Sequence, residues 1–383
     1  MKTVQGGISG FLTFVVLAGV GVLLIALFSN VGSGPAVPGL SPISTPPLPD
    51  QPESPLPTPS APLARIGPPV LLAAGQIRLA PGNRDKIVAI VNKDSGSYIA
   101  SLDPATRQEN KLTNKILISP HLTDRWLVYK DQSSPGTLYQ SRIKVINLTT
   151  KAEITLGSEN SIQDSPDVSG NIIVWSEARG SKKSEAGIYS YDLTTGQEFI
   201  VVKNSLAGYP SISDDWIIYL QAVGSWPTSA TGTLELRAHS LKTNEDFAIG
   251  LVWAARDARF GTFQAIDGDY VAWTKYDANR YVGELHVYDL KTRTDRQITA
   301  PTNGLPSNIS FSAKRGIVVF SSASEGWTIL DWLQPTPTSL SVKLPVESSL
   351  GHELSVVGDH LVWRVYLDRY VSESLVFAAK IAR

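Results

Sequence analysis

The side chains best suited to metal chemistry are scattered along this chain. Its 383 residues include no cysteine, which excludes disulfides, thiolate metal sites and a cysteine nucleophile. No two histidines stand at a spacing typical of zinc ligands. We therefore expect no metal and no cofactor. The five histidines are His121, His239, His286, His352 and His360.

Motifs for nucleophilic or phosphate chemistry are also missing. The sequence has no Gly-x-Ser-x-Gly elbow and no phosphate loop. Calcium loops are absent, and Asp267-Gly-Asp269 is expected to be a hairpin turn. Glu177 and Arg179 stand two apart near a strand end and so face the same side, where a structural ion pair is a simpler explanation than catalysis. The sequence predicts that the chain is not an enzyme.

The residues best suited to recognition lie in five segments of variable length, 132–141, 178–186, 222–232, 276–283 and 366–372. Variable loops on a repeated scaffold are where binding usually occurs. These loops hold aromatic and guanidinium side chains of the kind enriched at binding hot spots; simple exposure or packing within a loop is the alternative. The candidate binding face comprises Arg179, Trp226, Tyr276, Arg280, Tyr281, Arg369 and Tyr370.

A repeated β-unit must position these loops. In the unit 164–198, the apolar runs Ile172–Trp175 and Ile188–Tyr191 are bounded by turn residues, which is typical of antiparallel strands. A turn such as Asp192-Leu-Thr-Thr-Gly196 recurs in register with an aromatic that closes the first strand. We expect these aromatics to pack between neighbouring units. They recur about every 45 residues, at Tyr129, Trp175, Tyr219, Trp273, Phe320 and Trp363.

A period near 45 residues with about four strands per unit predicts an all-β fold, a β-propeller over residues 70–383. Its length favours seven blades, with six as the alternative. The last unit supplies only three strands, Glu353–Val357, His360–Val365 and Ser374–Ile381. We expect Val70–Ala74 to be the missing outer strand of that blade and to close the ring.

The unit around Trp175 resembles the repeat of TolB-like β-propellers. Pro166 is followed by a small turn, by an apolar strand ending in Trp175, by Glu177-Ala-Arg179, and then by Ile188-Tyr-Ser-Tyr-Asp-Leu-Thr-Thr-Gly196. The resemblance extends over residues 70–383 at the level of the repeat. It implies a propeller fold and an extracytoplasmic setting. It implies no catalytic activity, because such repeats serve binding proteins, translocation components and some enzymes.

The N-terminal region has a different composition. Ile8–Phe28 contains no charged residue and is long enough to cross a bilayer as a helix, so residues 1–30 are predicted to be a membrane anchor. Lys2 places the N-terminus in the cytoplasm and the rest outside. Secretion after signal-peptide cleavage is the alternative. Residues 31–69 hold 13 of the 25 prolines and predict a disordered stalk.

The charge balance narrows the set of partners. Lys and Arg number 34 and Asp and Glu number 35, a net charge of −1 that argues against nucleic acid as a partner. We therefore expect a cell-envelope module that binds a protein or a glycan through the variable loops. The alternative function is a lyase or glycosidase with its site at the central channel.

Overall fold

The computed structural model describes residues 62–80, 86–114, 118–131, 141–159, 161–179, 185–223, 232–254, 264–277, 282–300, 302–303, 306–322, 326–340, 352–367 and 373–383. The predicted transmembrane helix at 8–28 and the stalk up to residue 61 lie outside this part. Within the described ranges every element is a β-strand. No helix there is long and apolar enough to span a bilayer.

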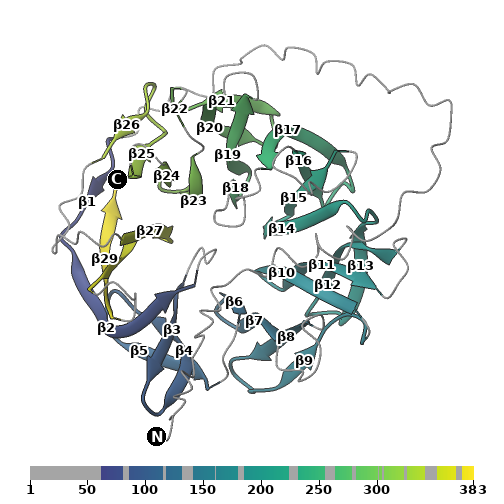
Figure 1. Cartoon of the computed structure of the whole chain (residues 1–383), viewed down its shortest axis with the longest axis horizontal. Helices are drawn as coiled ribbons and strands as arrows, with labels where there is room; N and C mark the ends of the chain where they lie inside the picture. The colour runs from purple at the N-terminus through teal and green to yellow at the C-terminus, as the bar shows by residue number, and fades with distance from the viewer. Residues whose placement is uncertain are drawn as a thin grey trace, which may run out of the picture.

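The strands form antiparallel sheets arranged in a ring (Figure 1). Two consecutive four-stranded sheets contain β6 (Ile118–Leu122), β7 (Trp126–Asp131), β8 (Arg142–Asn147) and β9 (Glu153–Thr155), and then β10 (Ser161–Ser169), β11 (Ile172–Arg179), β12 (Gly187–Asp192) and β13 (Gln197–Val202). The next contains β14 (Ala207–Ser213), β15 (Trp216–Ala222), β16 (Gly232–Ser240) and β17 (Asp246–Ala254).

Two more sheets continue the ring in the same order. One contains β18 (Gln264–Asp267), β19 (Tyr270–Asp277), β20 (Val282–Asp289) and β21 (Thr294–Gln297), with β22 (Thr302–Asn303) paired to β20. The other contains β23 (Ser307–Ser312), β24 (Ile317–Ser322), β25 (Gly326–Asp331) and β26 (Thr338–Ser339). The first strand of each sheet, β6, β10, β14, β18 or β23, lies nearest the centre of the ring, and we call these the inner strands (Figure 1).

An eight-stranded sheet joins the two ends of the described chain. Its order is β27 (His352–Val357), β28 (His360–Tyr366), β29 (Ser374–Ala382), β2 (Val70–Leu79), β3 (Ile87–Lys93), β4 (Gly96–Leu102) and β5 (Glu109–Thr113), and β1 (Arg65–Ile66) also pairs with β29. The three predicted strands of the last unit are confirmed within one residue at each end. Strand β27 is also an inner strand (Figure 1).

Strand β2 closes the ring by belonging to two groups of strands at once. Its first half, Val70 to Gly75, pairs with β29, and its second half, Gln76 to Leu79, pairs with β3. The predicted pairing of Val70–Ala74 with the last unit is therefore confirmed. Pairing begins even earlier, because β1 continues along the same edge of β29 and the Gly67 amide donates to the Lys380 carbonyl at 2.8 Å.

The recurring aromatic residues occupy equivalent places in the core. All six are at most 2% exposed. Each packs against the middle strands of the preceding sheet: Trp175 contacts the cluster containing Val128 and Val145, and Trp363 contacts Ile317 and Val319. The prediction that they pack between neighbouring units is confirmed. Because one unit cannot cover these rings alone, the sheets stabilise one another around the ring.

Most of these aromatics also have a polar tip that donates a hydrogen bond to a carboxylate. Tyr129 Oη lies 2.9 Å from Glu153, Trp175 Nε1 2.8 Å from Glu177, Tyr219 Oη 2.7 Å from Asp246 and Trp273 Nε1 3.2 Å from Asp295. A buried hydroxyl or indole N–H is costly unless it finds an acceptor. The acidic residues of the repeat therefore compensate for burial of its aromatic residues.

Replacing Tyr219 by Phe is expected to lower the free energy of unfolding by about 1.5 to 3 kcal/mol, the usual contribution of a hydrogen bond to a charged group. The ring still fits, but Asp246 loses a donor. Tyr288→Phe is the matched control, since in the described part of the chain the Tyr288 hydroxyl has no hydrogen-bond partner. Chemical denaturation of both variants measures the difference, and equal losses would contradict this account of the aromatic tips.

The hairpin turns have one shared geometry. In the turn after β12, Asp192 Oδ1 accepts the Thr194 amide at 2.7 Å, and the Gly196 amide donates to the Asp192 carbonyl at 2.8 Å. Gly196 takes a φ of 72°, a left-handed conformation that glycine adopts without strain. The turns after β4, β8, β16 and β20 repeat the backbone bond, with Arg107, Lys151, Asn244 and Arg293 in the left-handed position.

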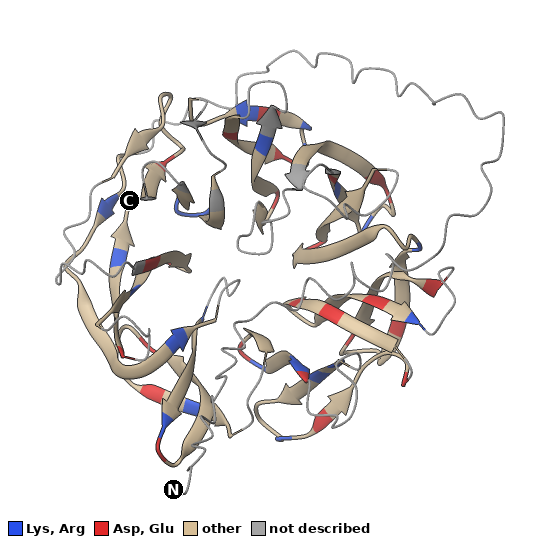
Figure 2. Ribbon diagram, in the orientation of Figure 1, with Lys and Arg blue, Asp and Glu red and all other residues tan. Residues whose placement is uncertain are grey.

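Side chains on the inner strands connect neighbouring sheets. Asp167 Oδ2 accepts the Ile212 amide at 2.9 Å, and Asp267 Oδ2 accepts the Ala313 amide at 2.7 Å. Charges of both signs are interspersed around the described part of the ring (Figure 2).

Candidate functional site

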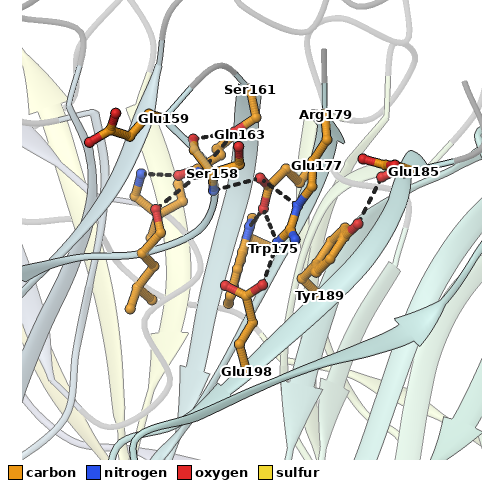
Figure 3. Close-up of polar contacts among 12 residues, drawn as sticks. Ser158, Glu159, Ser161, Gln163, Trp175, Glu177, Arg179, Glu185, Tyr189 and Glu198 are labelled. Carbon is orange, nitrogen blue, oxygen red and sulfur yellow. Dashed lines mark hydrogen bonds and ion pairs between the residues drawn. The ribbon is translucent and has the colours of Figure 1, made fainter. Parts of the chain in front are cut away.

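Arg179 is the one member of the predicted binding face whose side chain the structure describes. It lies at the end of β11 in a polar network (Figure 3). Its Nε is 3.0 Å from Glu177 Oε1, and it also pairs with Glu198 on β13. The guanidinium carbon lies 3.9 Å from the ring centroid of Tyr189. Arg179 is thus committed to contacts within its own sheet, and the predicted Glu177–Arg179 ion pair is confirmed.

Glu177 is the buried centre of this network (Figure 3). Besides Arg179, it accepts the Trp175 indole N–H at 2.8 Å and the Ser158 amide at 3.0 Å. Gly157, with a φ of 69°, passes so close that an added Cβ would lie 2.6 Å from Glu177 Oε2 and 2.1 Å from Gln163 Nε2. The carboxylate therefore holds together the β9–β10 connection and the middle of its own sheet, and its role is structural.

The same contacts make stability depend on pH. Burial disfavours ionisation of Glu177, but the hydrogen bonds from Arg179, Ser158 and Trp175 outweigh it and hold the pKa of the carboxyl below its ordinary 4.5. A depressed pKa stabilises the fold above the ordinary value, and this contribution is lost as the pH falls through the folded-state value. Thermal melts of wild type and Glu177→Gln should therefore differ at neutral pH and converge from roughly pH 4.5 downward.

The side chains of the other members of the predicted face lie outside the described part of the chain, so the prediction of a shared face stays a prediction. Tyr276 is in β19 near its end, and its side chain is outside the described part. The remaining five also lie outside it: Trp226, Arg280, Tyr281, Arg369 and Tyr370.

Four of the described inner strands share a backbone irregularity. In β6, β10, β14 and β23 the pairing register shifts at a bulge. One residue at each bulge takes a left-handed φ: 48° at Ser119, 51° at Ser165, 55° at Tyr209 and 53° at Asn308. Bulges re-aim side chains and are common next to functional sites. The structure thus places four polar-tipped side chains at equivalent positions around the axis.

Ionisable residues accompany three of these bulges. Lys130, whose side chain is 1% exposed, reaches from β7 to Asp164 on β10 with Nζ 2.8 Å from Oδ1. Asp164 Oδ1 also accepts the Ser165 amide at 2.7 Å. Tyr209 on β14 is close enough to Asp164 that, together with burial, the carboxylate raises the pKa of Tyr209 to about 12. We call Lys130, Asp164, Ser165 and Tyr209 the axial cluster.

A second ionisable group lies on the closing sheet. Glu353 on β27 accepts a hydrogen bond from the Tyr366 hydroxyl and lies 3.6 Å from Arg364 Nη1. Burial, then the Glu353 hydrogen bond, raises the pKa of Tyr366, while the nearby charge of Arg78 on β2 lowers it. Glu353 pairs across the sheet with Arg364 just as Asp164 pairs with Ser176, so the two acids occupy equivalent positions.

Motif reading could not find these clusters, because their members come from different sheets. The signal that was available is the Ser-Pro, Ser-Pro and Tyr-Pro dipeptides at 119–120, 165–166 and 209–210, which recur with the repeat. Among the described residues, no three His, Asp or Glu side chains gather into a set that could hold a metal. His121 instead lies 3.1 Å from Asp167, joining two inner strands.

Comparison with known proteins identifies the fold. The sequence matches no protein-family model and no curated protein. Among solved structures, an oligogalacturonate lyase in complex with manganese superposes with a TM-score of 0.57 at 12% identity, over 83% of this chain and 94% of that one. The β-propeller domain of the Trilobed protease from Pyrococcus furiosus superposes with a TM-score of 0.53 at 10% identity, over 81% and 96%.

The predicted resemblance to TolB is supported at the level of the propeller fold. TolB from Acinetobacter baumannii itself gives a TM-score of 0.43 at 12% identity, over 78% of this chain and 65% of that one. The fold assignment therefore rests on the superpositions with TM-scores of 0.57 and 0.53. At 12% and 10% identity, these establish the architecture alone.

The comparison also corrects the prediction that the chain is not an enzyme. A lyase shares the architecture over nearly its whole length, so this fold is one that carries catalysis. The prediction failed because it relied on linear motifs. A propeller site can instead collect single residues from several sheets. The chain is a β-propeller, and it shares this fold with a lyase and with the propeller domain of a protease.

Proposed function

We propose that this chain is a membrane-anchored, extracytoplasmic propeller of seven blades that binds a glycan at the centre of its ring. The axial cluster is the observation that carries the binding proposal. Three neighbouring sheets contribute a cation, a carboxylate, a hydroxyl and a phenol to it, and two of their inner strands carry bulges at Ser165 and Tyr209. Pockets that bind small polar ligands use a few converging polar groups of this kind.

Asp164 lies towards one end of its sheet. Ser161 pairs with Arg179 and Asp164 with Ser176, so this is the end of β11 from which the predicted recognition segment 178–186 continues. We further propose that recognition residues of the variable loops contribute to glycan binding together with the axial cluster.

Support for the proposed seven blades comes from dividing the eight-stranded sheet at Gly75. Strands β27, β28, β29 and the first half of β2 form one group of four, and the second half of β2 with β3, β4 and β5 forms another. These two groups and the five other sheets make seven units.

The anchor and the location rest on Ile8–Phe28 and on the proline-rich stalk. Full-length protein is expected to stay in the membrane pellet after an alkaline wash, and deletion of residues 1–30 is expected to release it. Protease added outside intact cells should cut the stalk. A mature protein that lacks residues 1–30 by mass spectrometry would instead establish signal cleavage.

The glycan proposal is tested with full-length protein in detergent micelles on a panel of immobilised oligosaccharides that includes galacturonate and galactose tetrasaccharides. Replacing Lys130 by Met together with Asp164 by Leu removes both charges and keeps comparable volume, which limits the loss of stability. The matched control changes Lys291 to Met and Asp269 to Leu, an ion pair 2.5 Å long in a hairpin-turn region. We expect binding by wild type and the control, and loss in the Lys130/Asp164 variant.

Elimination on an acidic oligosaccharide is the second candidate function. Glu353, Arg364 and Tyr366, with Arg78 nearby, provide a carboxylate, two cations and a phenol. A cation can neutralise a uronate carboxylate, a base can remove the neighbouring carbon-bound proton, and a protonated phenol can donate to the departing oxygen.

Absorbance of the unsaturated product, measured with galacturonate tetrasaccharide as substrate, tests this second function. Activity in wild type that is lost in Tyr366→Phe, with sugar binding retained, would establish elimination. No product after prolonged incubation would leave binding as the function.

A further inference from the structure

Tyr209 stands in a backbone position that does not favour an aromatic residue. Its φ of 55° is left-handed, where a side chain with a Cβ is strained and glycine is not. The equivalent bulges of other inner strands carry the small polar residues Ser119, Ser165 and Asn308. Asparagine in particular tolerates this conformation. A bulky ring at Tyr209 therefore needs a reason other than the backbone.

Core packing does not supply that reason. The side chain of Tyr209 is 37% exposed, whereas the six recurring aromatics are at most 2% exposed. At the same time burial raises the pKa of its phenol. Protein surrounds the aromatic side chain of Tyr209, yet solvent still reaches it. A position at the centre of the ring of sheets would produce this combination.

Asp164 lies on β10, the inner strand next to β14, with one carboxylate oxygen already fixed. Lys130 Nζ at 2.8 Å and the Ser165 amide at 2.7 Å both contact Oδ1. In the part of the chain that the structure describes, these contacts orient the carboxylate and leave Oδ2 as the acceptor for a ligand. A flat aromatic face beside a fixed carboxylate matches a sugar, whose C–H face packs on the ring while its hydroxyls donate to the acid.

The surroundings favour a sugar over a peptide. The other large apolar side chains that are exposed in the described chain lie away from the inner strands: Leu63, Leu71, Ile154, Phe199, Ile200, Val223, Leu251 and Leu367. Protein recognition usually relies on a group of apolar and aromatic anchors. Here Tyr209 is the one large exposed aromatic or apolar side chain on the described inner strands, which suits a ligand that is polar all round.

We propose that Tyr209 is the stacking platform for one pyranose ring of the bound glycan and that Asp164 accepts hydrogen bonds from its hydroxyls. This inference rests on the proposed glycan-binding function and names the residues that would carry it. It requires that the strained backbone at Tyr209 be retained for binding and not for stability.

The decisive variant is Tyr209→Gly, which relieves the left-handed strain and removes the ring. Its melting temperature should equal or exceed that of wild type, while its affinity for the tetrasaccharide that binds wild type, galacturonate or galactose, should fall by about tenfold or more, or 1.4 kcal/mol. Tyr209→Phe keeps the ring and should keep most of the affinity. Ser119→Gly, at the equivalent bulge of β6 and outside the axial cluster, is the matched control and should retain binding.

Calorimetric titration and thermal melts of full-length protein separate the outcomes. Loss of affinity in Tyr209→Gly without loss of stability supports the platform. Wild-type affinity in that variant, or its failure to fold while Tyr209→Phe and Ser119→Gly fold, would overturn the platform and leave glycan binding standing. No binding of any panel sugar by wild type, or a peptide ligand at this site, would overturn the proposed function itself.

Discussion

Replacing Glu177 by Ala is expected to lower the free energy of unfolding by about 3 to 5 kcal/mol. The substitution removes the acceptor for the Trp175 indole, for the Ser158 amide and for one side of Arg179. Burial prevents water from replacing those contacts fully, so the donors keep their desolvation cost. Urea denaturation followed by tryptophan fluorescence measures the loss.

The matched control for Glu177 is Glu235. It pairs with Arg237 two residues along β16, with 2.5 Å between Oε2 and Nη1, but its side chain is 23% exposed and Arg237 keeps Asp246 as a second partner. Such partly exposed pairs contribute about 1 kcal/mol or less. Equal losses in the Glu177→Ala and Glu235→Ala variants would show that the network of Figure 3 stabilises no more than an ordinary surface pair.

Deleting residues 62–75 is expected to have the second large effect, a loss of cooperative unfolding accompanied by self-association. The deletion removes β1 and the first half of β2 and so uncovers the edge of β29, including Val376 and Ala378 in the core. Asp331, which is buried, loses the Ala64 amide at 2.9 Å. An uncovered hydrophobic edge strand is a template for pairing with another chain.

A deletion of equal length within the stalk, residues 36–49, is the control for this experiment. It should leave the melting transition unchanged, because no residue of the described sheets is removed. Differential scanning calorimetry and light scattering compare the two. A sharp, wild-type transition in the 62–75 deletion would show that the ring closes without this strand.

The sequence predicted the repeated parts of the structure well. Trp175 and Trp363 lie in the core because one physical requirement, burial against the preceding sheet, acts on every unit and leaves a periodic trace. The strand Val70–Ala74 could be assigned by elimination, since the last unit had too few strands of its own. The Asp192 turn could be read from a side chain that caps its own loop.

The sequence could not predict the candidate site, because nothing local requires its members to meet. Lys130 and Asp164 are 34 residues apart and come from adjacent sheets, so only the docking of those sheets brings them together. The left-handed conformation of Tyr209 depends on register across β15. For the same reason a linear motif was the wrong test for catalysis, and its absence in the sequence did not exclude an enzyme fold.

The closure at β29 also determines how the molecule would bear a load. The proposed stalk enters the ring at β1, and β1 and β2 lie antiparallel along a single strand, from Arg65 opposite Ala382 to Gly75 opposite Ser374. Tension on the membrane-tethered protein would therefore act along the seam that β1 and β2 form with β29. The hydrogen bonds along this seam would be loaded in shear and would resist together. The strands that complete the fold would therefore also attach the propeller to its stalk.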